Sequence, residues 1–252
     1  MADMPTISGT RIAFSSYNPA DCNGPYNDLA VLSGGILRAM ACNPGNPVIL
    51  PSGQTHFGYV DHAALDVVVR ARDFVIPQGF YFSLDGSAVL TPRDGEPIGV
   101  IISAPAYKGF VQIGQLEWVG RLRYINGCTD SLLIPPIKLG DPCLNLLYFP
   151  ANTDQTMHTH PSDRIGMILS GRGICQTEDE SGTHEIPLEA GMLFCIHTGG
   201  LHKFQTFDAA MRVLAYHPDS DFGPTDEDHP MINRTMVDGV SAAKLTEIHT
   251  TK

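Results

Sequence analysis

Hydrophobic and polar positions alternate over short stretches along much of this chain. In the first half, β-branched or alternating runs stand at 65–70, 74–77, 81–84 and 98–103. In the second half, the same texture returns at 144–149, 165–169, 192–197 and 212–216. Runs of this length, separated by turn residues, are typical of short strands in a β-sandwich or barrel. The pattern therefore predicts an all-β protein whose two strand-rich halves meet at about residue 125.

The segments outside these runs differ in composition. Residues 1–30 are rich in Asn, Pro, Gly and Ser, which predicts an irregular arm. Short helices are expected at 28–41 and 240–248. The charged stretch 217–229 is expected to be a solvated loop rather than a second metal site, and it is also a candidate lid for the barrel mouth.

Turn signals lie between the two halves, at Asn126-Gly127 and Pro135-Pro136. They divide the chain into an N-terminal arm, a first domain, a second domain and a C-terminal extension, at 1–30, 31–125, 126–216 and 217–252.

Charge and cysteine content narrow the range of partners. The 16 Lys and Arg residues against 27 Asp and Glu give a net charge of −11, which repels nucleic acid and anionic lipid surfaces. The first residues lack an apolar core flanked by basic residues, and no run is long enough to span a membrane. The six cysteines contain no CxxC pair, so reduced thiols are expected. We expect a soluble, cytoplasmic protein without nucleic-acid or membrane partners.

Three histidines are the candidate metal ligands. His158 and His160 are two residues apart, which places both imidazoles on one face of a strand. His202 starts another strand after a Gly199-Gly200 turn that allows it to pair back toward the first. Three neutral imidazoles suit Fe, Mn, Ni, Cu, Co or Zn and leave coordination positions open. Taken alone, two histidines at this spacing are as consistent with exposed or hydrogen-bonded side chains.

These residues and the glycines around them resemble the two motifs of the cupin superfamily. The first motif is matched by His158, His160 and Gly171, and the second by Gly191, Gly199 and His202. The resemblance covers residues 126–216. It implies a small jelly-roll barrel that binds one divalent metal ion in its mouth through the three histidines.

The chain departs from these motifs at two positions. Arg164 replaces the metal-binding Glu, and an Arg cannot be a ligand because it stays protonated, so a three-histidine site is expected. Asp163 is one strand position out of phase for replacing that Glu. If Arg164 faces the metal, an anion must lie between them, which implies an acidic substrate. The alternative is a rim Arg paired with Asp163 or the acidic run at 178–180. His197 replaces a Pro and is either a catalytic acid or base in the pocket or a rim residue without a role.

The first half contains a fragment of the second motif. Residues 73–82 read DFVIPQGFYF, with Phe82 where the metal-binding His stands, and no paired histidines precede them. This similarity implies two tandem barrels of which the N-terminal one is degenerate and metal-free; the alternative is an unrelated β extension. Because the apolar face of such a half needs covering, a homodimer is expected.

The resemblance implies an enzyme as the leading reading of function. A three-histidine Fe(II) site resembles those of cupin dioxygenases, and here it is expected to act on a small, anionic substrate. The alternative is an isomerase, lyase or hydrolase in which Zn, Mn or Ni acts as a Lewis acid. A third reading is a protein that binds a small acid without turnover.

Overall fold

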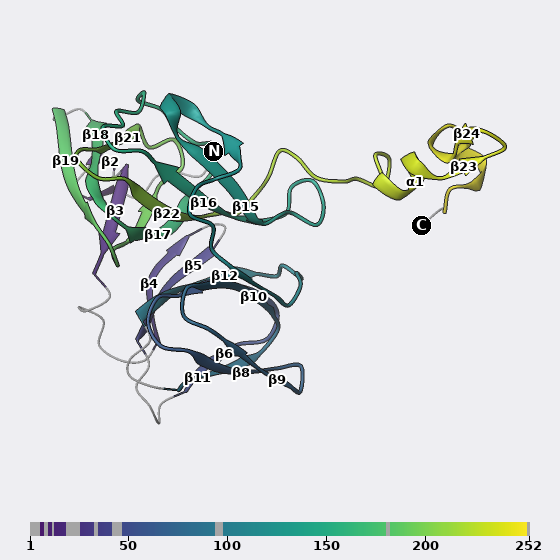
Figure 1. The fold of residues 1–252 in the computed structure, drawn as a ribbon, viewed down its shortest axis with the longest axis horizontal. Helices are drawn as coiled ribbons and strands as arrows, with labels where there is room; N and C mark the ends of the chain where they lie inside the picture. Colours follow the sequence, from purple (N-terminus) through teal and green to yellow (C-terminus); the bar gives the residue numbers. More distant parts are fainter. Residues whose placement is uncertain are drawn as a thin grey trace.

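The computed structural model describes residues 6–7, 10–11, 13–18, 26–32, 35–41, 47–93, 98–179 and 182–250. Almost all regular structure in these residues is antiparallel β, as the alternating pattern predicts. The strands form two stacked barrels, from which a C-terminal extension projects (Figure 1).

The N-terminal barrel consists of two sheets with the strand orders β13-β10-β7-β12-β5-β4 and β6-β11-β8-β9. Its strands are β4 (Tyr26–Leu32), β5 (Gly35–Ala41), β6 (Val48–Leu50), β7 (Gln54–Val60), β8 (Leu65–Val69), β9 (Arg72–Ile76), β10 (Phe80–Asp85), β11 (Ala88–Pro92), β12 (Ile98–Pro105) and β13 (Gln112–Gln115). The helix expected at 28–41 is wrong. Those residues form β4 and β5, because β5 pairs along its length with β12 and these long-range hydrogen bonds override local propensity.

The C-terminal barrel has a seven-stranded sheet, β14-β15-β16-β22-β17-β20-β3, facing a three-stranded sheet, β19-β18-β21. Its strands are β3 (Phe14–Tyr17), β14 (Leu122–Arg123), β15 (Thr129–Ile134), β16 (Cys143–Phe149), β17 (Arg164–Ser170), β18 (Arg172–Asp179), β19 (Gly182–Glu189), β20 (Leu193–Ile196), β21 (His202–Thr206) and β22 (Met211–His217). The Asn126-Gly127 turn lies between β14 and β15, where both residues have positive φ.

One strand of the C-terminal barrel comes from the other end of the chain. β3 pairs antiparallel with β20 at the edge of the seven-stranded sheet, with Phe14 opposite Ile196. The Phe14 side chain is buried, and its ring stacks on that of Phe194 at 5.7 Å between centroids. Part of the segment expected to be an irregular arm is therefore an integral strand of the C-terminal barrel. The two short strands β1 (Thr6–Ile7) and β2 (Thr10–Arg11) precede it.

Hydrophobic side chains form one cluster inside each barrel and a third between the barrels. The alternation along β22 explains this: Val213 packs inside the C-terminal barrel, whereas Leu214 and Tyr216 pack toward the N-terminal barrel. Tyr216 is fully buried, with its ring 5.2 Å from that of Phe57 in β7. The C-terminal barrel thus covers the apolar face of the N-terminal half. Because this face was the reason to expect a homodimer, the homodimer stays a prediction that needs another argument.

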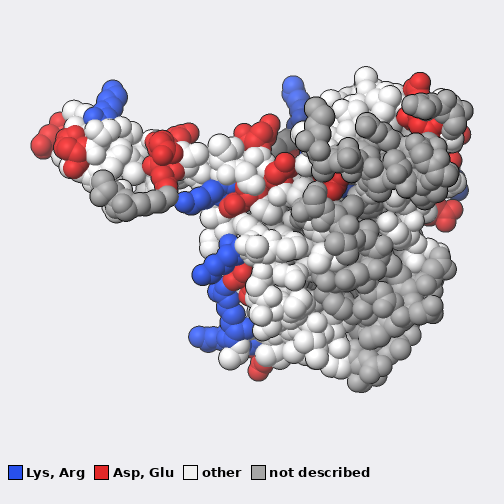
Figure 2. Space-filling model, turned by 180° about the vertical axis from the view of Figure 1, so that it is seen from behind, with Lys and Arg blue, Asp and Glu red and all other residues white. Residues whose placement is uncertain are grey.

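The C-terminal extension first runs along the loop after β15, where Gly140 N donates to Ser220 O and Leu139 N to Pro224 O. Residues 230–250 then stand clear of both barrels (Figures 1 and 2). The extension contains α1 (Pro230–Arg234), β23 (Met236–Val237), β24 (Val240–Ser241) and two 3-10 turns, η3 (Ala242–Lys244) and η4 (Thr246–Ile248). The helix expected at 240–248 is thus replaced by a short strand and these turns. Residues 230–250 lie away from the barrels, and the lid expected of 217–229 stays a prediction. Among the described residues, no helix is long and apolar enough to cross a membrane.

Candidate metal centre

The three predicted ligands come together at the mouth of the C-terminal barrel. His202 begins β21, and His158 lies opposite it in the segment between β16 and β17. The two backbones exchange hydrogen bonds, from His158 N to His202 O at 2.9 Å and from His202 N to His158 O at 3.0 Å. One candidate ligand atom from each of His158, His160 and His202 lies within 4.8 Å of the other two. The described part of the chain adds no carboxylate to this cluster.

Hydrogen bonds to the backbone orient two of the imidazoles. His158 Nδ1 lies 2.8 Å from Thr156 O, and His202 Nδ1 lies 2.9 Å from Gly200 O. A carbonyl oxygen only accepts, so each Nδ1 carries the hydrogen and donates it. The lone pair is then left on Nε2, which is the arrangement that metal-binding histidines require.

The charge state of the cluster also suits a metal. Burial, with a smaller contribution from the nearby Arg164, lowers the pKa of His160 to about 2. Burial lowers the pKa of His202 to about 4. Both imidazoles are therefore neutral near pH 7, and the neutral form is the one that binds a metal. The donor set and its geometry fit a divalent ion of the Fe, Mn, Ni or Zn type with coordination positions to spare.

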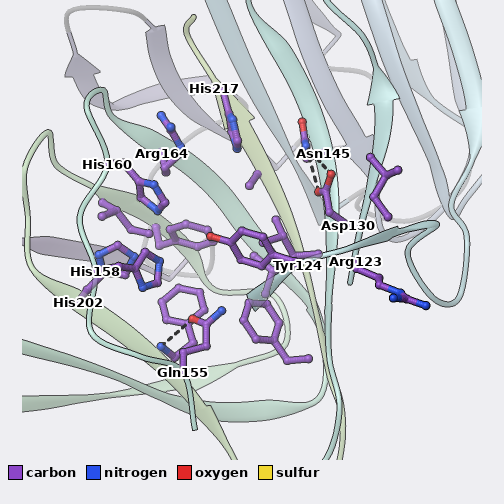
Figure 3. Close-up of a pocket in the computed structure, with 18 residues that line it drawn as sticks. Arg123, Tyr124, Asp130, Asn145, Gln155, His158, His160, Arg164, His202 and His217 are labelled. Carbon is purple, nitrogen blue, oxygen red and sulfur yellow. Dashed lines mark hydrogen bonds between the residues drawn. The ribbon is translucent and has the colours of Figure 1, made fainter. Parts of the chain in front are cut away.

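The histidines stand in one wall of a pocket of about 210 Å³ inside the C-terminal barrel (Figure 3). Much of the rest of the wall is apolar, with inward-facing side chains of the seven-stranded sheet such as Leu147, Phe194 and Val213. Gly166 of β17 has no room for a side chain, because a Cβ there would lie 1.8 Å from the Leu214 carbonyl oxygen. Ala215, paired with it in β22, has a small side chain and lines the pocket.

Arg164 is the first residue of β17 and lies in the pocket wall near His160 and His217 (Figure 3). Its Nη1 donates to Ser162 O at 3.0 Å, Ser162 Oγ at 2.7 Å and Asp163 O at 3.0 Å. Its Nε is buried and has no acceptor among the described residues. Since Nε–H and one Nη2–H point the same way, the edge of the guanidinium that binds a carboxylate with two hydrogen bonds is left without a protein partner.

The other sequence candidates lie elsewhere. Asp163 accepts hydrogen bonds from the backbone N and the Oγ1 of Thr198, both at 2.8 Å, and so faces that loop. His197 is not among the residues that line the pocket. It is buried with Nε2 2.9 Å from Ser15 Oγ, so it links β20 to β3.

Two polar features of the pocket escaped the sequence reading. His217, at the end of β22, lines the wall beside Arg164, and burial lowers its pKa to about 3. Asn145 and Asp130 are polar residues at inward-facing positions of β16 and β15. The alternation of the strand could have identified Asn145. Its neighbours Leu144 and Leu146 face the other barrel, so Asn145 must face the interior of its own barrel.

In the N-terminal half, Phe82 and His56 are core residues without a role in a metal site among the described residues. Phe82 is fully buried in the core of the N-terminal barrel, and its ring lies against Gly58, where a Cβ would come within 2.3 Å of it. His56 is also buried and bonds to Ser103 Oγ at 2.7 Å and Pro51 O at 2.9 Å. The descent of this half from a second cupin domain stays a prediction.

Comparison with known proteins identifies the fold. No protein-family model matches the chain, and no curated protein matches its sequence. Solved structures do match. A cupin 2 conserved barrel domain protein from Leptotrichia buccalis is 12% identical with a TM-score of 0.54, over 83% of this chain and 91% of that one.

Two enzymes are also similar in structure. A salicylate 1,2-dioxygenase variant from Pseudoaminobacter salicylatoxidans is 10% identical with a TM-score of 0.57, over 73% of this chain and 71% of that one. Oxalate decarboxylase from Bacillus subtilis, a protein with Mn(II) centres, is 10% identical with a TM-score of 0.53, over 99% of this chain and 89% of that one. The chain therefore has the cupin fold, and its C-terminal barrel contains a three-histidine cluster that fits a metal ion.

Proposed function

We propose that this protein is a metal-dependent enzyme that uses molecular oxygen to oxidise a small organic acid. The observation that carries the proposal is the presence, in one largely apolar pocket, of three neutral imidazoles and an Arg164 edge without a protein partner. Fe(II) held by the three histidines would supply the redox chemistry, since imidazole ligands with open positions suit oxygen-using iron.

The side chains of the pocket have separable tasks in this proposal. Arg164 binds the substrate carboxylate through Nε and Nη2 and orients the molecule beside the metal. The apolar side chains of the sheet exclude water, which strengthens that ion pair. His217, neutral beside Arg164, can donate or accept a hydrogen bond with the substrate. The similarity to a salicylate dioxygenase supports the reading at the level of fold.

The second candidate is a Lewis-acid enzyme that contains Mn, Ni or Zn and does not consume oxygen. The similarity to a decarboxylase with Mn(II) centres favours it, and three imidazoles bind these ions as well. In that case Arg164 still orients an acid, but the metal only polarises the reacting bond. Capture of an acid without turnover is the third possibility.

Metal content and oxygen use distinguish the candidates. Protein purified without added metal is analysed for elements, then reconstituted anaerobically with Fe(II) and screened for oxygen uptake with benzoate, salicylate, 2-oxo acids and amino acids. The proposal expects one iron per chain and uptake with at least one acid. Manganese or zinc without uptake supports the Lewis-acid enzyme. Iron-loaded protein that consumes oxygen with none of the acids contradicts the proposal.

A further inference from the structure

A second polar group lies across the pocket from the histidines. Asn145 of β16 and Asp130 of β15 both line the pocket, and Figure 3 shows them on the side away from His158 and His202. Asn145 Nδ2 donates to both carboxylate oxygens of Asp130, at 3.0 and 2.9 Å. The side chain of Asn145 is only 7% exposed. A buried amide bonded to a half-buried carboxylate is unusual in a barrel interior that is otherwise largely apolar.

The hydrogen bonds determine which way the amide of Asn145 points. A carboxylate only accepts, so the amide nitrogen must face Asp130 and the amide oxygen must face away. That oxygen, Oδ1, is buried and finds no donor anywhere in the described residues. Buried carbonyl oxygens rarely lack a donor, because leaving one unpaired is costly.

A small residue stands beside Asn145 in the sheet. Asn145 is paired with Ala215 in β22, which also lines the pocket. A larger side chain at position 215 would take up pocket volume next to Asn145. Burial also raises the pKa of Asp130, an effect that a donor or cation placed next to it would reverse. This part of the pocket wall therefore consists of hydrogen-bond acceptors, of which the buried Oδ1 of Asn145 lacks a donor among the described residues.

We propose that Asp130 and Asn145 form a subsite that binds an N–H or O–H donor of the substrate. The pocket then has two complementary unpaired groups, the donor Nε of Arg164 and the acceptor Oδ1 of Asn145. They stand two strands apart in the sheet and are offset by two residues along the strands, roughly 12 Å between backbones. The substrate class is a bifunctional acid, with an amino, amide or hydroxyl group remote from its carboxylate. The inference rests on the proposed function only for the carboxylate at Arg164.

Matched ligands test the subsite directly. Protein loaded with Zn(II), which cannot turn over with oxygen, is titrated calorimetrically with benzoate and with its 3- and 4-amino and 3- and 4-hydroxy derivatives. The 2-substituted isomers are left out because their donor would chelate the metal. At least one derivative should bind about 10-fold or more tightly than benzoate. Derivatives that all bind no better than benzoate would overturn the subsite.

Variants show whether Asn145 is the origin of the preference. Asn145→Leu should remove the advantage of the derivative, so that the ratio of its affinity to that of benzoate, measured in the same variant, falls to about 1. Leu147→Ala, at the next inward position of β16, is the matched control and should weaken both ligands by similar factors. If Asn145→Leu is not folded by circular dichroism, Asn145→Ser takes its place. An advantage that persists in a folded Asn145 variant contradicts the assignment.

Failure of the subsite and failure of the proposed function give different results. Oxygen uptake with acids that lack a second donor, and no preference among the benzoates, would refute the subsite and leave the oxygenase standing. A preference for ligands with a second donor that depends on Asn145, in protein that consumes no oxygen, would support the subsite and refute the oxygenase.

Discussion

Replacing Arg164 should separate substrate binding from metal binding. Its Nε and Nη2 are the only hydrogen-bond donors of the guanidinium without partners among the described residues, since Nη1 is held by Ser162 and Asp163. Each charge-assisted hydrogen bond to a carboxylate contributes about 1.5–3 kcal/mol. Arg164→Lys keeps the charge and one bond, so the loss is about 2–3 kcal/mol, or about 100-fold in affinity for the acid.

Arg164→Met should have effects of opposite sign on the two ligands. Loss of both bonds and of the charge should weaken acid binding by about 1,000-fold. The affinity for the metal should rise, because the substitution removes the Arg164 cation, which disfavours a second positive charge next to His160. Calorimetric titration with benzoate and competition with a metal-binding dye measure the two quantities.

Arg123 provides the matched control, since it is also a pocket arginine but is exposed and points away from the histidines (Figure 3). Arg123→Met should change acid binding by less than about 1 kcal/mol, as expected for an exposed charge. The reasoning is refuted if the Arg164 variants bind acids as the wild type does, or if Arg164→Met loses metal and acid together.

Three further predictions concern the metal, pH and assembly. His158→Ala, His160→Ala and His202→Ala should each abolish stoichiometric metal binding in a folded barrel, with the exposed His184→Ala as control; full occupancy in any of the three rejects that ligand. In metal-free protein the depressed pKa values of His160 and His217 keep them neutral, whereas the unfolded chain takes up protons below about pH 6.5, so stability is lost as pH falls. Urea unfolding should show a loss on the order of 1 kcal/mol per histidine between pH 7.5 and 5.5, and a flat profile would contradict it. Light scattering at micromolar concentration should show a homodimer, because the extension exposes Met231 and Met236, and monomer alone would refute it.

The three-histidine cluster could be predicted from sequence, although the strand expected through His158 and His160 is not formed. These two residues lie outside the named strands, and an isolated bridge from His158 to His202 brings the imidazoles together. The structure adds the hydrogen bonds to Thr156 and Gly200 that select the tautomer, which depend on the loop conformation.

The features that escaped prediction depend on contacts distant in sequence. The stretch 28–41 is a strand pair because β12 lies beside it, and no local pattern reports that neighbour. The neighbours of Asn145 in the sheet come from β15 and β22, so its surroundings are set by residues far along the chain. The sequence also could not show that His217 lines the pocket and that His197 does not. That difference depends on the pairing of β3 with β20, which the local pattern does not reveal.

The place of β3 in the C-terminal barrel has a consequence for how the chain is made. β3 is synthesised before the N-terminal barrel, yet its partner β20 begins at Leu193, so it must wait unpaired while most of the protein is translated. Closing a loop of about 180 residues costs about 4–5 kcal/mol of chain entropy. Contacts of such long range slow folding, because their entropy is lost before they contribute stability. The barrel with the histidines is therefore completed only after nearly the whole polypeptide has left the ribosome.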